Sequence, residues 1–169
     1  SLNVSSIVKG IAKTFVEMAK SRNITFLSKI PEQVMWNSDK GFLNTIIINL
    51  ISNAFKYTPD GQSIKIEVDT SRENMLALRV ANEGSTIKEK DFQYIFNRYA
   101  ILDNFENQDE KNFSRNGLGL AISYNMAKLL NGTLKVENTP DGWVMFTLTL
   151  PVVELTTGVV ETKRLTAEY

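Results

Sequence analysis

The chain of 169 residues carries 19 basic and 19 acidic side chains, so its net charge is zero and no basic block supports sequence-independent binding of nucleic acid. It has no cysteine and no histidine, which excludes disulfides, thiol and imidazole catalysis, and metal sites built from these residues. With 43% hydrophobic residues it can bury the core of one domain, and any metal in it must be held by oxygen ligands, which favours magnesium or calcium.

The sequence begins at Ser1 without an initiator methionine or a signal peptide, so we expect a processed protein or a piece of a longer chain. No apolar run reaches the roughly 20 residues that a membrane-spanning helix needs.

The first half of the chain predicts two helices separated by strands. Apolar side chains three or four positions apart between Val4 and Met18 indicate one helix. A long helix extends from the N-cap candidates Ser38 and Asp39 to about Tyr57, where Thr-Pro-Asp-Gly forms a turn. Short apolar or alternating segments predict strands at residues 23–28, 33–36, 63–69 and 75–81.

The second half begins with a short helix at residues 89–96 and a polar stretch, residues 97–116, with little periodicity. So long a loop in a compact domain is usually a functional lid or a disordered segment. A helix then opens at Gly117 and ends at the C-cap signal Asn131-Gly132. Two strands around a second Thr-Pro-Asp-Gly turn, followed by a tail or linker, complete the chain: residues 133–138, 143–150 and 152–169.

This order of elements predicts an α/β (α+β) fold, a two-layer sandwich over residues 1–151. We expect a mixed sheet of about five strands with three main helices on one of its faces.

The long helix has no charged residue between Gly41 and Phe55, yet one narrow face of it is polar. At about 100° per residue, five polar side chains fall within an arc of about 100°: Thr45, Asn49, Ser52, Asn53 and Lys56. We expect the rest of the circumference, including Ile48 and Phe55, to be apolar and buried. A solvated face would favour glutamate and lysine, which are better helix formers, whereas short amides suit the floor of a polar ligand site. From this helix alone, both interpretations stay open.

Two glycine-containing segments favour the ligand site. Residues 82–87, Asn-Glu-Gly-Ser-Thr-Ile, follow an expected strand, where the backbone can approach a ligand closely. Residues 117–120, Gly-Leu-Gly-Leu, open a helix whose free N–H groups and dipole favour phosphate. Each segment is a weak signal alone, but an asparagine stripe, a strand-end glycine, a lid and a glycine helix start in this order are much more specific.

The chain resembles, from about Leu2 to Pro151, the catalytic ATP-binding domain of bacterial sensor histidine kinases, within the superfamily of gyrase, Hsp90, MutL and these kinases. NLISNAFKYTP is similar to the family's asparagine box, ANEGSTI to its first glycine box, DFQYIFNRY to its phenylalanine box, and NGLGLA to its second glycine box. The closing TPDGWVMFTLTLP resembles the family's last hairpin. RYAILDNFE and NGLGLAI look most like the hybrid two-component sensors. The resemblance implies a Bergerat-type fold with an ATP lid.

The resemblance also implies ATP and Mg²⁺ as cofactors and a role for each matching residue. Asn53 would ligate the metal through its side-chain oxygen, and Asn49 and Lys56 would assist in positioning phosphate, with no certain catalytic group. Tyr57 would pack near Lys56, and Asn82 would face the adenine amino group. The other matching residues would shape the base pocket, reach the phosphates or close over them: Gly84, Ile87, Arg98, Gly117, Leu118, Gly119 and Leu120.

Four positions bear on the activity that the resemblance implies. Asn49 stands where the superfamily's ATPases have a glutamate base, and an amide cannot act as a general base, so the site resembles the kinase type. Asn82 replaces a usual aspartate, and Thr86 and Arg115 replace usual glycines. Exchanging a charge-assisted bond for a neutral one at Asn82 is expected to cost about 1–2 kcal/mol, or about ten-fold in affinity.

The sequence therefore predicts the catalytic domain of a protein-histidine kinase of the two-component type, which binds Mg-ATP and donates its γ-phosphate to a histidine on a separate dimerisation domain. The expected partners are that domain and a downstream receiver domain. We expect an isolated monomer and a cytoplasmic location as part of a membrane-bound sensor. Three alternatives remain: a degenerate ATP-site module that acts in signal transmission or partner binding, a hydrolysing ATPase, and an α/β domain without a site.

Overall fold

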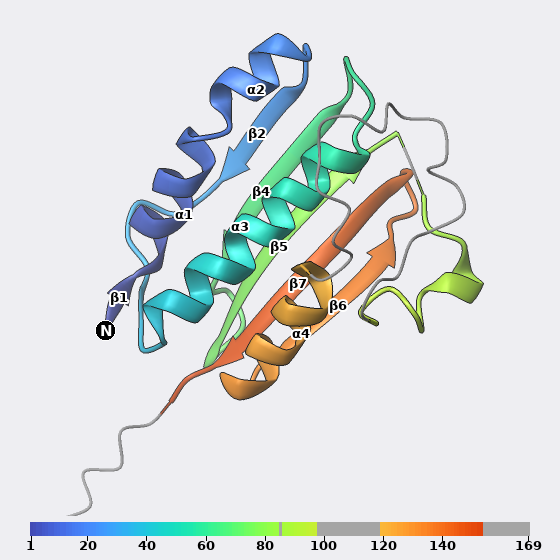
Figure 1. Cartoon of the computed structure of the whole chain (residues 1–169). Coiled ribbons are helices and arrows are strands. Elements are labelled where there is room, and N and C mark those ends of the chain that lie inside the picture. Colours follow the sequence, from blue (N-terminus) through green and yellow to red (C-terminus); the bar gives the residue numbers. More distant parts are fainter. Residues whose placement is uncertain (85, 98–118, 154–169) are drawn as a thin grey trace, which may run out of the picture.

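The computed structural model describes residues 1–84, 86–97 and 119–153. Its elements in chain order are β1 (Leu2–Asn3), α1 (Val4–Lys13), α2 (Val16–Ser21), β2 (Thr25–Lys29), β3 (Met35–Trp36), α3 (Lys40–Tyr57), β4 (Ser63–Asp69), β5 (Met75–Glu83), the 3₁₀ helix η1 (Glu89–Asp91), α4 (Gly119–Leu129), β6 (Thr133–Asn138) and β7 (Trp143–Pro151). The helices α1 to α4 form one layer over a single face of the main sheet (Figure 1). The predicted two-layer α/β fold is confirmed.

The main sheet has five strands in the order β2-β4-β5-β7-β6. It is mixed, because β2 runs parallel to β4 while every other neighbouring pair in it is antiparallel. Successive side chains of a strand point to opposite faces, and burial alternates accordingly along β4 and β7. The alternation of apolar and polar residues that predicted strands at 63–69 and 143–150 therefore has a simple cause. One face of the sheet packs on the helices, and the other face is open.

The single helix expected between Val4 and Met18 is wrong, because the chain forms two helices there. The hydroxyl of Thr14 donates to the carbonyl of Ile11 at 2.7 Å, a local bond that competes with helix continuation. The apolar spacing nevertheless continues across the break, since the Phe15 ring stacks on Phe55 at a centroid distance of 5.3 Å. Both helices thus pack on the same core.

Four other elements differ in their bounds from the sequence prediction. The strand expected to end at residue 81 continues through Asn82 and Glu83, because these residues pair with Val144 and Trp143 of β7. The helix expected over 89–96 is only a three-residue 3₁₀ helix followed by turns. The first two strands are shifted and shortened to Thr25–Lys29 and Met35–Trp36, and the latter pairs with the unpredicted β1.

The helix α3 is the centre of the core. Its buried side chains form most of its circumference: Leu43, Ile46, Ile47, Leu50, Ile51, Ala54 and Phe55. Ile48 was expected to join them but is 44% exposed. It lies at nearly the same angle on the helix as Phe55 by the ~100° rule. Phe55, however, is covered by the rings of Phe15 and Phe26, whereas Ile48 lies roughly 10 Å nearer the start of the helix.

The predicted end of α4 is confirmed as a Schellman motif. The N–H of Asn131 donates to the carbonyl of Lys128, and the N–H of Gly132 donates to the carbonyl of Ala127. Asn131 has the left-handed backbone, with φ of 56°, whereas Gly132 is required by space, because a Cβ there would lie 2.4 Å from the carbonyl oxygen of Thr149. This glycine lets α4 turn directly into β6 against β7.

The two ends of the described domain lie close together. β1 and the end of β7 are at the end of the molecule where α3 begins, while the turn after α3 lies at the opposite end (Figure 1). Asn37, Ser38 and Asp39, which precede α3, line one hollow together with Pro151 and Val153. The first and last strands of the described domain therefore lie at the same end as the start of α3.

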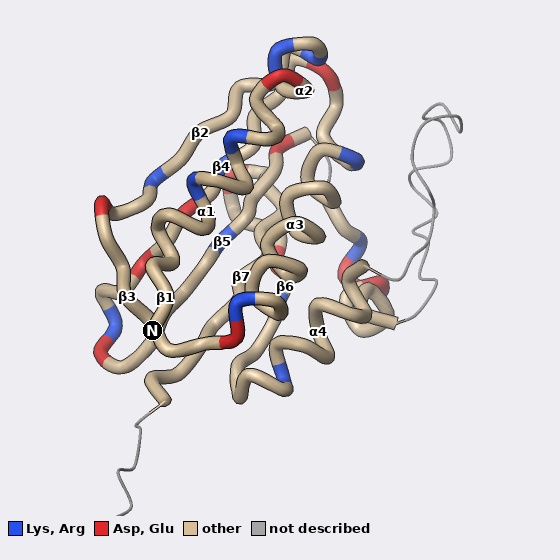
Figure 2. The backbone as a smooth tube through the Cα atoms, turned by 60° about the vertical axis from the view of Figure 1, so that its left-hand side comes forward, with Lys and Arg blue, Asp and Glu red and all other residues tan. Residues whose placement is uncertain are grey.

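Basic residues (Lys and Arg) and acidic residues (Asp and Glu) are intermixed along the described part of the chain (Figure 2). Among the helices of residues 1–84, 86–97 and 119–153, none is long and apolar enough to cross a membrane.

The open face of the sheet carries a charge network around Arg79. Its guanidinium lies 3.1 Å from the Asp69 carboxylate and 3.5 Å from that of Glu67, which also pairs with Lys29. The backbone N–H of Ser71 donates to Asp69 at 2.8 Å. The Ser71 backbone bond, together with the Ser71 side chain and Arg79, lowers the pKa of Asp69 from 3.8 to about 2.

Because its pKa is lowered on folding, the ionised Asp69 stabilises the folded state above about pH 4, and this contribution is lost as the pH falls toward 2. Asp69→Asn should therefore be less stable than the wild type at pH 7 and approach it in stability between pH 4 and pH 2. Urea unfolding across this range measures the difference. Glu73→Gln, on the exposed β4–β5 turn, is the control. A difference that stays constant with pH would contradict the prediction.

Candidate functional site

The polar stripe of α3 lies on the side of the helix opposite the buried residues Leu43, Ile47 and Ala54, as the rotation of about 100° per residue predicted. Asp39 caps the helix by accepting the N–H of Phe42 at 2.8 Å, and this cap fixes where the helix begins. Asn49, Asn53 and Lys56 are half-buried. The stripe is therefore partly enclosed, unlike the face of a freely solvated helix.

The side chain of Asn49 joins the stripe to the start of α4. Its amide nitrogen donates to the carbonyl of Gly119 and to the hydroxyl of Ser123, both at 3.1 Å. Because both amide hydrogens are engaged, Asn49 can offer a ligand only its side-chain oxygen. The structure thus brings the asparagine stripe and the glycine helix start together across 70 residues of sequence. Ser123, which is fully buried, was missed by the sequence analysis.

Lys56 and Tyr57 lie at the last turn of α3. The ammonium group of Lys56 is 5.2 Å from the centre of the Tyr57 ring, which places a cation against an aromatic face. Both side chains are half-buried, so Lys56 keeps access to solvent or to a ligand.

Gly84 directly follows β5 and has a backbone that favours glycine, since its φ is +88°. A Cβ at this position would lie 3.0 Å from Cδ of Pro59 and 3.1 Å from Cγ of Gln62. The close approach inferred from sequence is therefore present, but its partner within the protein is the turn that follows α3. Asn82, two residues earlier in β5, is only 3% exposed.

Ile87 is fixed by a side chain that the sequence analysis missed. Asn138, the last residue of β6, accepts the N–H of Ile87 at 3.0 Å and donates to its carbonyl at 2.7 Å. The Asn138 amide thus pairs with Ile87 as a neighbouring strand would. Ile87 itself is 6% exposed, and the segment after Gly84 is held against the β6 edge.

The middle of α4 is packed against the phenylalanine-box segment. Phe96 stacks on Tyr124 of α4 at 5.0 Å and meets Phe146 of β7 edge-on at 6.2 Å. Gly119 and Leu120 open α4, and Leu120 packs partly buried on the core.

The remaining predicted site positions lie outside the described residues: Arg98, Gly117, Leu118, Arg115 and the rest of the expected lid at 97–116, apart from Asn97. Their assignments remain predictions.

The donor chemistry here restricts which metal would fit. Within the described ranges, no group of three or more acidic, histidine or cysteine side chains could hold a metal ion. Asn49 and Asn53 lie one turn apart on α3 and supply neutral amide oxygens. Mg²⁺ is commonly bound by one or two protein oxygens together with water and phosphate oxygens, so these residues fit Mg²⁺ accompanied by a phosphate ligand.

The fold and this arrangement of asparagine helix, strand end and glycine helix start are those of an ATP-binding domain. The chain belongs to the family of histidine kinase-, DNA gyrase B- and HSP90-like ATPases, whose sequence pattern matches residues 38–154. The predicted family is therefore confirmed.

Curated relatives within this family are sensor kinases. The sensor histidine kinase TmoS of Ectopseudomonas mendocina is 31% identical over 150 residues, which cover 89% of this chain and 15% of that protein. The hybrid signal transduction histidine kinase D of Dictyostelium discoideum is 29% identical, over 89% of this chain and 10% of its own length. The chain thus spans only a small part of the curated relatives that it matches.

A solved structure of the catalytic domain of the histidine kinase ThkA has the same fold, with a TM-score of 0.75 over 89% of this chain and 95% of that chain at 23% identity. This likeness shows the fold, and the family match together with the sequence relatives identifies the chain as an ATP-binding catalytic domain of the histidine kinase type. The comparisons give no support to the alternative of a degenerate module.

The contact of Gly84 with the Pro59 turn predicts a graded response to added methyl groups. Gly61→Ala and Gly142→Ala should each cost about 1–2 kcal/mol of unfolding free energy, because their φ values of +84° and +87° strain an L-residue while no heavy atom lies within 4 Å of the new Cβ. Gly84→Ala should cost more, since it adds the contact with Pro59 to similar strain. Urea unfolding of the three variants measures this, and equal losses would refute the role of the contact.

Proposed function

We propose that this domain binds Mg-ATP between α3, the end of β5 and the start of α4, and that the protein to which it belongs transfers the γ-phosphate to a histidine. The observation that carries the proposal is the Asn49 amide bonded to Gly119 and Ser123 at 3.1 Å, which joins the asparagine helix to the glycine helix start. The oxygen of Asn49 and the N-terminus of α4 then face the same ligand, and a helix N-terminus favours phosphate.

On the phosphate side, Asn53 ligates Mg²⁺ through its side-chain oxygen, with Asn49 assisting. The remaining metal positions belong to water and to the phosphates, as Mg²⁺ prefers. Lys56, held beside the Tyr57 ring, pairs with phosphate. The other phosphate-side positions come from the lid and the helix start: Arg98, Gly117, Leu118, Gly119 and Leu120.

On the base side, the buried Asn82 accepts a hydrogen bond from the adenine amino group. Gly84 and Ile87 shape the pocket around the base, and Asn138 holds Ile87 in place. Because Asn82 is a neutral acceptor, we expect affinity about ten-fold below that of a carboxylate at the same position.

In the transfer reaction, this domain positions ATP and neutralises the charge of its phosphates. Asn49 cannot activate water as a base, so hydrolysis is slow and ATP is held for another nucleophile. The chain has no histidine, so the phosphate acceptor lies on a separate dimerisation domain. The domain itself comprises residues 1–151 with 152–169 as a tail or linker, and the isolated domain is monomeric.

A receiver domain is the downstream partner in this proposal. Support comes from the solved complex of the histidine kinase ThkA with the response regulator protein TrrA, whose kinase shares this fold with a TM-score of 0.74. The relatives that are sensor kinases and a hybrid kinase support a cytoplasmic position within a membrane-bound sensor of the hybrid two-component type.

Calorimetric titration of ATP, ADP and GTP, with and without magnesium, tests the site. We expect adenine nucleotides to bind in a magnesium-dependent manner, and Asn53→Ala to weaken Mg-ATP binding at least ten-fold because it removes a metal ligand. Asn44→Ala, the same change on α3 outside the polar stripe, is the matched control and should bind as the wild type does.

Three outcomes would contradict parts of the proposal. If the folded wild-type protein gives no heat with any nucleotide, the residues Asn82, Thr86 and Arg115 have abolished nucleotide binding. The domain would then be assigned as a partner-binding module and not as a kinase domain. Unchanged binding by Asn53→Ala would remove the metal assignment. Steady phosphate release from ATP without a partner would indicate a hydrolysing ATPase.

A further inference from the structure

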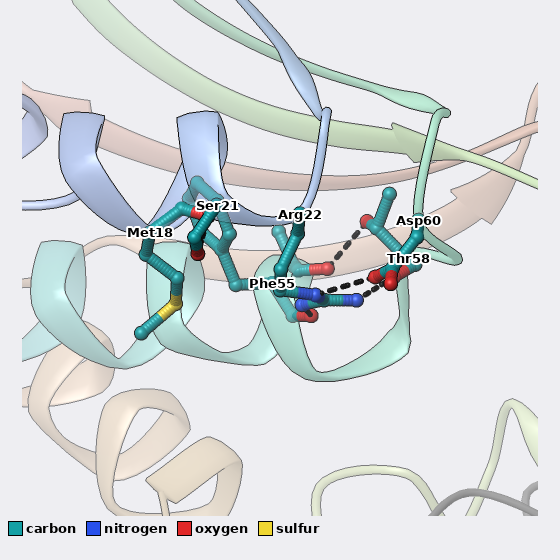
Figure 3. A network of polar contacts seen from close by, with 7 residues as sticks. Met18, Ser21, Arg22, Phe55, Thr58 and Asp60 are labelled. Carbon is teal, nitrogen blue, oxygen red and sulfur yellow. Dashed lines mark hydrogen bonds and ion pairs between the residues drawn. The ribbon is translucent and has the colours of Figure 1, made fainter.

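Arg22, between α2 and β2, binds the end of α3 through three separate acceptors. Its guanidinium donates to the carbonyls of Phe55 and Thr58 and, at 2.7 Å, to the carboxylate of Asp60 (Figure 3). Its own carbonyl accepts the N–H of Gly61 at 3.1 Å. One residue thus holds four groups of the segment 55–61, from a position more than 30 residues earlier in the chain.

The carbonyls that Arg22 binds are groups that a helix end leaves without a partner. The last carbonyls of a helix have no intrahelical donor, and a cation there also complements the helix dipole. A guanidinium can satisfy several acceptors at once because its donors lie in a fixed planar fork. The Arg22 side chain is only 21% exposed and Thr58 is fully buried, so these bonds are partly shielded from water.

The segment 55–61, which Arg22 holds, connects the two sides of the proposed nucleotide site. Lys56 and Tyr57 lie between the two carbonyls that Arg22 binds, and Asn53 lies less than one turn before them. On the other side, Pro59 contacts the position of Gly84 at the end of β5. A displacement of this segment would therefore move the phosphate-side groups and the base-side strand end together.

We propose that Arg22 is a positioning residue for nucleotide binding, which fixes the turn after α3 so that Asn53, Lys56 and Gly84 face the same ligand. This inference rests on the proposed function. Arg22 does not touch the ligand itself and acts through the carbonyls of Phe55 and Thr58.

The ion pair with Asp60 is not the source of this effect. Asp60 is 72% exposed, and exposed pairs of this kind contribute little. Removing Asp60 should leave the carbonyl bonds intact. A lysine at position 22 would keep the charge, but its single ammonium group cannot reproduce the planar fork.

The test is calorimetric titration of Mg-ATP into wild type, Arg22→Ala, Arg22→Lys and Asp60→Ala, at a temperature where circular dichroism shows each protein fully folded. Arg79→Lys, on the open sheet face, is the control for an arginine in an ion-pair network away from the site. We expect affinity to fall at least ten-fold in Arg22→Ala and several-fold in Arg22→Lys, and to stay within two-fold of wild type in Asp60→Ala and Arg79→Lys.

A purely structural role would lower the unfolding midpoint of the Arg22 variants and leave the affinity of the folded protein unchanged. Binding within two-fold of wild type by folded Arg22→Ala would therefore overturn the inference, and if that variant does not fold, the same result for Arg22→Lys would overturn it. A ten-fold loss in Asp60→Ala would also do so, by assigning the effect to the ion pair. If the wild type binds no nucleotide, the proposed function fails first, and the role of Arg22 in binding fails with it.

Discussion

The two hydrogen bonds that the Asn49 amide donates to α4 are the constraint on which the arrangement of this site depends. They join a helix at the centre of the core to a helix that begins 70 residues later. The contact is possible because the β6–β7 hairpin continues the sheet beyond β5 and carries α4 into the helix layer beside α3. The fold thus places an amide oxygen opposite a helix N-terminus, which is a suitable pair of groups for a metal-bound phosphate.

A second set of contacts gathers at the other end of the polar stripe. The turn after α3 touches β5 through Pro59 and Gly84, and the segment after β5 is held to β6 through Asn138. Each contact uses a backbone group or a glycine rather than an exposed charge. The proposed pocket is therefore surrounded by short-range packing, in which small displacements are costly.

Elements with strong periodicity and clear end signals were predictable from the sequence. The helix α3 has an Asp39 cap and a Thr-Pro-Asp-Gly end, and β4 has strict alternation, so both bounds were found. The exposure of Ile48 and the extension of β5 through Asn82 were not, because neighbouring segments decide them. The break at Thr14 was not, because the apolar spacing continues across the local bond that interrupts the helix. The bonds from Asn138 to Ile87 and from Arg22 to Phe55 join distant residues, and no local pattern encodes such pairs.

The position of β1 and of the end of β7 at one end of the domain has a mechanical consequence. With both near the start of α3, the proposed nucleotide groups lie toward the far end of a helix of 18 residues, about 27 Å long. A small rotation of the domain about this end would therefore move a phosphate bound at the proposed site through a much larger arc than the residues that precede α3.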